Sequence, residues 1–132
     1  LGPATVVGRG LGAYVALLIA GARPHLVRGA ALLDGTGLAG GGTAPTSAII
    51  THVDPDAQPV PDPWALVELA RDVRPADYAT AFVRQATQLS GLTWALAVCA
   101  RSRPPWLEAV AGEPGVLDTD IAEAISVFAA AP

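Results

Sequence analysis

Three glycines at alternate positions, Gly8, Gly10 and Gly12, constrain this chain more than any other feature of its sequence. They follow a short β-branched run and precede an apolar stretch, residues 11–22, that carries no charged residue. Glycine has no Cβ, and we expect the tight turn to require glycine at both Gly8 and Gly12. The pattern predicts a buried strand over 4–7 that turns sharply into a helix.

Beyond this turn, the pattern predicts a unit of strand, helix and parallel strand. Gly21 and Pro24 end the helix, and an apolar run over 28–33 forms the second strand before Asp34. Because the helix is apolar on nearly every side, we expect it to be covered on all sides. Parallel strands joined by a helix form a right-handed crossover, so the sequence predicts an α/β fold.

The rest of the chain contains one irregular stretch, followed by several short predicted helices and a strand. Residues 35–63 are rich in Gly, Pro, Thr, Ser and Asp, which is typical of a long functional loop or lid. A cap-like helical segment follows over 62–90, and its second helix begins after Pro75. The run 92–100 fits a third buried strand or a helix segment, and we favour the strand. Two helices complete the chain, one from Pro104-Pro105 through Ala111 and one capped by Asp120 with Glu123.

The length of the chain limits how many domains it can form. The 132 residues fit one domain, 1–132, but enzyme folds of this class commonly exceed ~200 residues. The sequence contains no Met and starts almost directly on a strand. We therefore expect a partial domain that lacks its N-terminal part.

Composition excludes several classes of partner. The net charge is -4, and all eight cationic residues are dispersed arginines, which argues against a nucleic-acid surface. The longest apolar run is shorter than the ~20 residues that span a bilayer, so no membrane segment is expected. One cysteine, Cys99, is typical of a reducing cytoplasm and of a buried, inert thiol. The abundance of Ala, Gly and Arg indicates a GC-rich bacterial genome.

The glycine turn and the connection after the helix resemble the α/β-hydrolase superfamily. Members often read V-V-G-H-S-L-G-G-Y-V-A-L at the strand, turn and helix called the nucleophile elbow. Here Val6-Val7-Gly8-Arg9-Gly10-Leu11-Gly12 takes those places, Arg23-Pro24-His25-Leu26-Val27-Arg28-Gly29 matches the connection, and Asp34 ends the next strand. The resemblance implies a partial α/β-hydrolase-like, three-layer arrangement of parallel strands and helices with a helical cap.

The same resemblance implies that the catalytic groups are largely absent. The nucleophile position is Gly10, and the stretch where the acid commonly follows the strand after the cap reads Arg101-Ser102-Arg103. No histidine follows His52 to serve as the late base. A Ser-His-acid triad needs all three groups within hydrogen-bond reach. We therefore expect a catalytically impaired pseudoenzyme that acts as a binding or partner-interacting domain.

Two other functions stay open from the sequence. Asp34 and His52 would form the acid and base of an active enzyme of the same superfamily if they lay within about 3 Å of each other or were bridged by a water molecule. The simpler interpretation is a turn-capping Asp and a solvated His. Alternatively, Gly8 to Ala13 fits the dinucleotide-binding pattern G-x-G-x-x-A, with Asp34 near the ribose position. The hydrolase-like connection, and our expectation that no further regular strand and helix alternation follows, disfavour this alternative.

Arg9, Gly10 and Leu11 are the candidate ligand-binding residues. A permanent cation beside a helix N-terminus favours an anionic small molecule, and a salt bridge from Arg9 to a nearby Asp is the simpler interpretation. We expect neither a metal nor a cofactor. An incomplete fold would leave a strand edge and helix faces uncovered, so we also expect a protein partner or self-association in an oligomer.

Overall fold

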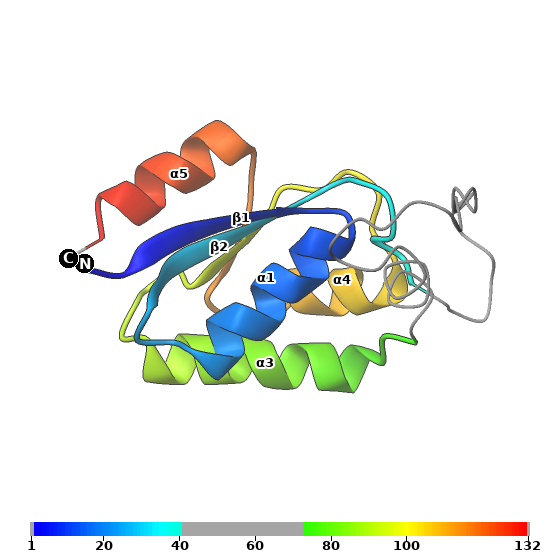
Figure 1. Cartoon of the computed structure of the whole chain (residues 1–132), viewed down its shortest axis with the longest axis horizontal. Coiled ribbons are helices and arrows are strands. Elements are labelled where there is room, and N and C mark those ends of the chain that lie inside the picture. The colour runs from blue at the N-terminus through cyan, green and yellow to red at the C-terminus, as the bar shows by residue number, and fades with distance from the viewer. Residues whose placement is uncertain (1, 41–72, 132) are drawn as a thin grey trace, which may run out of the picture.

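A four-stranded parallel sheet with helices on both faces forms the described part of the protein, residues 2–40 and 73–131 of a computed structural model (Figure 1). The strands lie side by side in chain order, β1-β2-β3-β4, and every neighbouring pair is parallel. This arrangement confirms the predicted α/β class. The elements are β1 (Ala4–Arg9), α1 (Leu11–Ala22), β2 (Val27–Leu33), α3 (Ala76–Leu89), β3 (Leu96–Val98), α4 (Pro105–Ala111), β4 (Val116–Asp118) and α5 (Ile121–Ala129).

The predicted unit of strand, helix and strand is present at the start of the chain, but the prediction that its first strand is buried is wrong. Only Gly8 of β1 is buried, because β1 pairs with β2 alone in the described sheet. β1 pairs with β2 in parallel, with Gly8 opposite Leu32 and Arg9 opposite Leu33. Six of the seven residues of β2 are buried, as expected for a strand that has neighbours on both sides and helices on both faces. The α1 helix begins at Leu11, directly after Gly10, and thereby keeps the turn short.

Three helices, α1, α3 and α4, cover one face of the sheet, and α5 covers the other (Figure 1). The helices pack closely where glycine allows it: a Cβ at Gly21 of α1 would lie within 3 Å of Phe82 in α3. The larger core lies on this side. Its largest fully buried side chains are Trp106, Leu17, Leu32, Leu96, Leu107, Val83, Val98 and Val110.

The opposite face is closed by α5. The ring of Phe128 lies against Gly29 of β2, where the backbone has a φ of 115° and a Cβ would come within 2.3 Å of the ring. Asp120 Oδ1 accepts the backbone N–H of Glu123 at 2.8 Å and satisfies a donor in the first turn of α5. This contact confirms the predicted capped start of the last helix.

The chain continues to alternate between strands and helices after Asp34. The predicted helix after Pro75, the strand within 92–100 and the helix from Pro105 to Ala111 are confirmed. The expectation that no regular alternation follows is wrong, because β4 and its parallel pairing with β3 extend the pattern. β4 has only three residues, too few to show a periodicity in the sequence.

The predicted loop falls largely outside the described residues, and the first part of the predicted cap does too. Within 35–63 the structure describes 35–40, and within 62–90 it describes 73–90. The described part of the predicted cap is α3, which packs between α1 and α4 in the helical layer on the sheet.

The α1 helix is not covered on all sides, contrary to the expectation from its composition. Val15 is 43% exposed and Ile19 is 40% exposed. The physical reason is its place at the edge of the helical layer, where α3 and Trp106 of α4 pack against the same flank of the helix. No helix in the described ranges is long and apolar enough to cross a membrane.

Candidate functional site

The turn between β1 and α1 has the sharp geometry that its glycines predict. Gly10, the N-cap of α1, has a φ of 59° and a ψ of -124°. An L side chain rarely adopts this φ, so glycine relieves strain here. A Cβ at Gly8 would lie 2.1 Å from the carbonyl oxygen of Gly12. Gly12 itself is different: a Cβ there would meet no atom within 4 Å, so the prediction that the turn requires glycine at this position is wrong.

The loop after β2 fills the space beside Gly10. The Thr36 carbonyl accepts the backbone N–H of Leu11 at 2.9 Å. A Cβ at Gly10 would lie 2.2 Å from that carbonyl oxygen and 2.6 Å from the carbonyl carbon of Gly35. The space that a nucleophilic side chain would need is therefore occupied by backbone, and Gly10 is buried.

Two buried side chains hold this loop in place. Arg74 is 7% exposed, and its guanidinium donates hydrogen bonds to the carbonyls of Gly37 and, at 2.9 Å, Leu38. The indole N–H of Trp106 donates to the same Leu38 carbonyl at 2.8 Å. Tyr14 joins the two, since Arg74 lies 4.8 Å above its ring and Trp106 meets it edge-on at 5.1 Å. Sequence reasoning missed these anchors, because nothing local relates Arg74 or Trp106 to a loop after β2.

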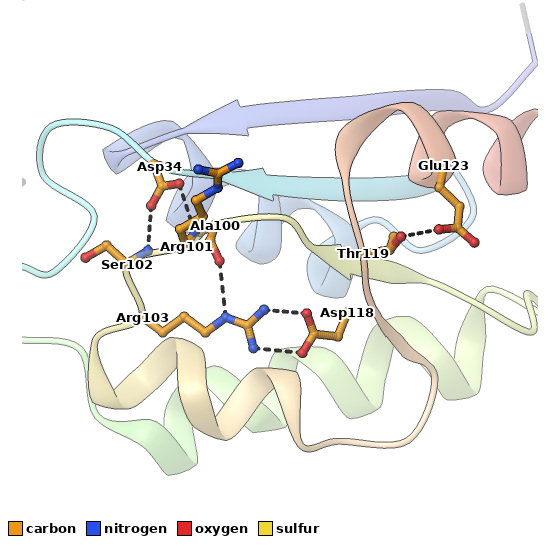
Figure 2. Close-up of polar contacts among 8 residues, drawn as sticks. All are labelled: Asp34, Ala100, Arg101, Ser102, Arg103, Asp118, Thr119 and Glu123. Carbon is orange, nitrogen blue, oxygen red and sulfur yellow. Dashed lines mark hydrogen bonds and ion pairs between the residues drawn. The ribbon is translucent and has the colours of Figure 1, made fainter.

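Asp34 lies at the end of β2 and ties it to the connection after β3 (Figure 2). Its Oδ2 accepts the backbone N–H of Arg101, and its Oδ1 accepts that of Ser102, both at 2.8 Å. These two hydrogen bonds lower the pKa of the carboxyl group, and they outweigh its partial desolvation. His52, its predicted partner, lies outside the described residues. The structure therefore shows Asp34 as a clamp between neighbouring segments.

The clamp predicts an acid-sensitive contribution to stability. A lowered folded-state pKa means that Asp34 stabilises the fold above the unfolded pKa of about 3.9, and that this contribution is lost as the pH falls further. We expect Asp34→Asn to lower the free energy of unfolding at pH 7 by about 1 kcal/mol, because one of two charge-assisted acceptors is lost from an exposed site. The difference from the wild type should shrink below about pH 4. Urea denaturation between neutral and acidic pH measures both effects.

The matched control for this prediction is Glu108→Gln, which changes an exposed carboxylate on α4. It should change the free energy of unfolding at pH 7 by less than about 0.5 kcal/mol, because the side chain is exposed. An Asp34→Asn protein whose deficit stays constant down to the lowest pH would contradict the ionised clamp.

An ion pair joins the segment after β3 to the last residue of β4. The guanidinium of Arg103 binds both carboxylate oxygens of Asp118, with Nη1 2.9 Å from Oδ2, and its Nε donates to the Ala100 carbonyl at 3.1 Å (Figure 2). The bidentate contact lowers the pKa of Asp118. Cys99 lies half-buried nearby, and burial followed by the carboxylates of Asp120 and Asp118 raises its pKa. A raised pKa makes this thiol a poor nucleophile, as its apolar neighbours predict.

The three candidate ligand-binding residues differ in accessibility. Arg9 is exposed at the end of β1 and forms no ion pair with any residue the structure describes, so the interpretation as a salt bridge finds no support there. The backbone N–H of Leu11 is committed to Thr36, and Gly10 is buried. Of the three, only Arg9 carries a polar side chain, and it has no ion-pair partner among the described residues.

No metal centre is formed within 2–40 and 73–131, where no three His, Cys, Asp or Glu side chains gather. His25 is exposed in the turn before β2, at the end of the sheet opposite Gly10. No family model matches the chain, and no curated protein or solved structure is significantly similar to it.

Proposed function

We propose that this chain is an α/β-hydrolase-like domain that does not hydrolyse substrates and that acts by binding a partner. The observation that carries the proposal is the Thr36 carbonyl. It accepts a hydrogen bond from the Leu11 N–H, a group that in the family would help to stabilise an oxyanion. It also occupies the space that the side chain of a nucleophile at Gly10 would need. The unpaired thiol of Cys99 favours the reducing cytoplasm as its compartment.

The strand and turn geometry supports the hydrolase-like interpretation. A nucleophile elbow needs a sharp, strained turn from a strand into a helix, and Gly10 has such a backbone. The resemblance places the acid after β3 and the base after the last strand. After β3 the chain carries Arg103, and the last residue of β4, the last described strand, is Asp118. Their ion pair can join the two strands' ends but cannot relay a proton at neutral pH.

The strand order disfavours the dinucleotide-binding alternative. In the Rossmann order, 3-2-1-4-5-6, the fourth strand lies beside the first, whereas β4 here pairs with β3. A pyrophosphate would also need free N–H groups at the start of α1, and Leu11 already donates to Thr36. Both oxygens of Asp34, the residue at the ribose position, accept hydrogen bonds from Arg101 and Ser102.

The alternative of an active enzyme depends on His52 and stays a prediction. Asp34 is the member of that pair that the structure describes. Its carboxyl group has a lowered pKa, which makes it a weak base. No observation in the described residues favours it over the binding function.

Ester hydrolysis tests the proposal. We expect the protein to turn over p-nitrophenyl acetate and butyrate no faster than its Cys99→Ser variant or buffer, and to resist labelling by a fluorophosphonate probe. The Cys99→Ser control removes any slow reaction of the thiol. Saturable turnover that survives this substitution would contradict the proposal. Calorimetric titration with NAD should give no saturable heat, and clear affinity would instead favour the dinucleotide-binding alternative.

A further inference from the structure

Two arginines at the carboxyl end of the sheet form no ion pair with any residue that the structure describes. Arg9 is the last residue of β1, and Arg101 lies in the connection after β3. Both are exposed, and the two ion pairs found within 2–40 and 73–131 use other arginines. In open α/β sheets, ligands bind outside the carboxyl ends of the strands. The two cations therefore lie where a fold of this class places its ligands.

Both arginines flank the same short stretch of this edge, the end of β2. The Cα of Arg9 is the partner of Leu33 in the register of β1 with β2. The backbone N–H of Arg101 donates to Asp34, the next residue along, at 2.8 Å. Two strand spacings separate β1 from β3, so the two backbones lie on the order of 10–12 Å apart. Figure 2 shows the Arg101 side chain extending across the end of β2 in the direction of β1, so one small ligand can contact both guanidinium groups.

The two side chains also share a face of the sheet. A Cβ at Gly8 would meet the first turn of α1, so alternation along β1 directs Arg9 to the opposite face, where α5 packs. Cys99 packs against the core under α5, and two residues later the same alternation brings Arg101 to that face. The end of β2 thus has a guanidinium on either side of it, and both lie on the face of α5.

We propose that Arg9 and Arg101 together bind the phosphate group of a small, soluble phosphate monoester. The phosphate group of a monoester has three acceptor oxygens, and guanidinium groups bind such oxygens in bidentate pairs. Two guanidinium groups on opposite sides can therefore share one phosphate, whereas a carboxylate has two oxygens that a single guanidinium already satisfies. The two arginines outnumber the one carboxylate between them, Asp34, whose oxygens both accept backbone N–H groups.

The rest of this edge favours a small ligand over a polyanion. Beside the ion pair of Asp118 with Arg103, the carboxylates of Asp120 and Glu123 lie at the start of α5. The β4 side of the edge is therefore acidic. A nucleic acid or an anionic membrane is bound by clustered Lys and Arg over a wide surface, and the acidic side would repel it. Two cations on either side of one carboxylate instead match a single, doubly charged group.

This inference rests on the binding part of the proposed function, and calorimetric titration with phenyl phosphate at neutral pH tests it. We expect saturable binding in about 0.1 M salt, which screens charges more than about 10 Å away. Arg9→Gln and Arg101→Gln should each weaken it about tenfold, the effect of one charge-assisted hydrogen bond. The matched control is Arg23→Gln, which removes an exposed arginine at the other end of α1 and should bind as the wild type does. All three variants should keep the circular dichroism spectrum of the wild type.

Nuclear magnetic resonance of the arginine side chains tests whether one ligand contacts both. Phenyl phosphate should shift the Nε–H signals of Arg9 and Arg101 with one common dissociation constant, and it should leave that of Arg23 in place. A shift at only one of the two overturns the shared site. Three further results overturn the inference: no saturable binding, equal affinity for phenylacetate, and binding only to vesicles that contain phosphatidic acid. A protein that binds no phosphate and hydrolyses no ester overturns only this inference, and one that binds phosphate and hydrolyses esters overturns only the proposed loss of catalysis.

Discussion

The Gly10→Ser protein should have no esterase activity and a free energy of unfolding lower by about 3–4 kcal/mol. The substitution restores the chemical group that the nucleophile elbow lacks, but it does not restore the space around it. The serine Cβ would lie 2.2 Å from the Thr36 carbonyl oxygen, so the loop after β2 must move. The new side chain would also have to accept a φ of 59°. Both effects raise the free energy of the folded state.

Urea denaturation followed by circular dichroism measures the loss, and the p-nitrophenyl ester assay measures the activity. Gly112→Ala is the matched control, because Gly112 ends α4 in a helical conformation and its Cβ would make only ordinary contacts. We expect it to change stability by less than about 0.5 kcal/mol. Stable Gly10→Ser protein with measurable turnover would show that the loop yields easily, and that the site is a latent enzyme.

Trp106→Ala should destabilise the protein by about 3–5 kcal/mol, the largest loss expected from a single core side chain. The indole is 1% exposed and packs against Tyr14, and it donates its N–H to the Leu38 carbonyl. Trp106→Phe separates these contributions, because phenylalanine keeps most of the apolar contact and loses the donor. We expect it to cost about 1–2 kcal/mol.

Equilibrium denaturation ranks the two variants, and hydrogen exchange at the Leu11 amide reports on the loop. If Trp106 anchors the loop, the Leu11 amide should exchange faster in Trp106→Phe, because the Thr36 carbonyl that protects it moves more often. A phenylalanine variant with wild-type protection at Leu11 would show that Arg74 is sufficient to hold the loop.

The first half of the fold was predictable because its signals are local. The glycine turn, the apolar run of α1 and the buried run of β2 each occupy consecutive residues, and the structure has them within a few residues of the predicted ends. The strand β4 was not predictable, because its three residues are recognisable only by their pairing with β3. The exposure of α1 was also missed, since composition indicates how apolar a helix is and not which neighbours it has.

In the candidate site, too, some features could be predicted from the sequence and others could not. The absence of a nucleophile at Gly10 is visible in the sequence, whereas the Thr36 carbonyl beside it depends on how a loop folds back over the turn. Asp34 was correctly placed at the end of a strand. Its role as a clamp was hidden, because its partners Arg101 and Ser102 contribute backbone N–H groups, which every residue except proline possesses.

The Asp34 clamp joins residues that are 67 and 68 positions apart, and this separation bears on the order of folding. The β1–α1–β2 unit closes over a short stretch of chain, and so does the pairing of β3 with β4. Bringing β3 to β2 closes a far longer loop, and contacts of high sequence separation form slowly. We therefore expect two small parallel units to form early and to dock late. Substitutions at Asp34 should then speed unfolding more than they slow refolding.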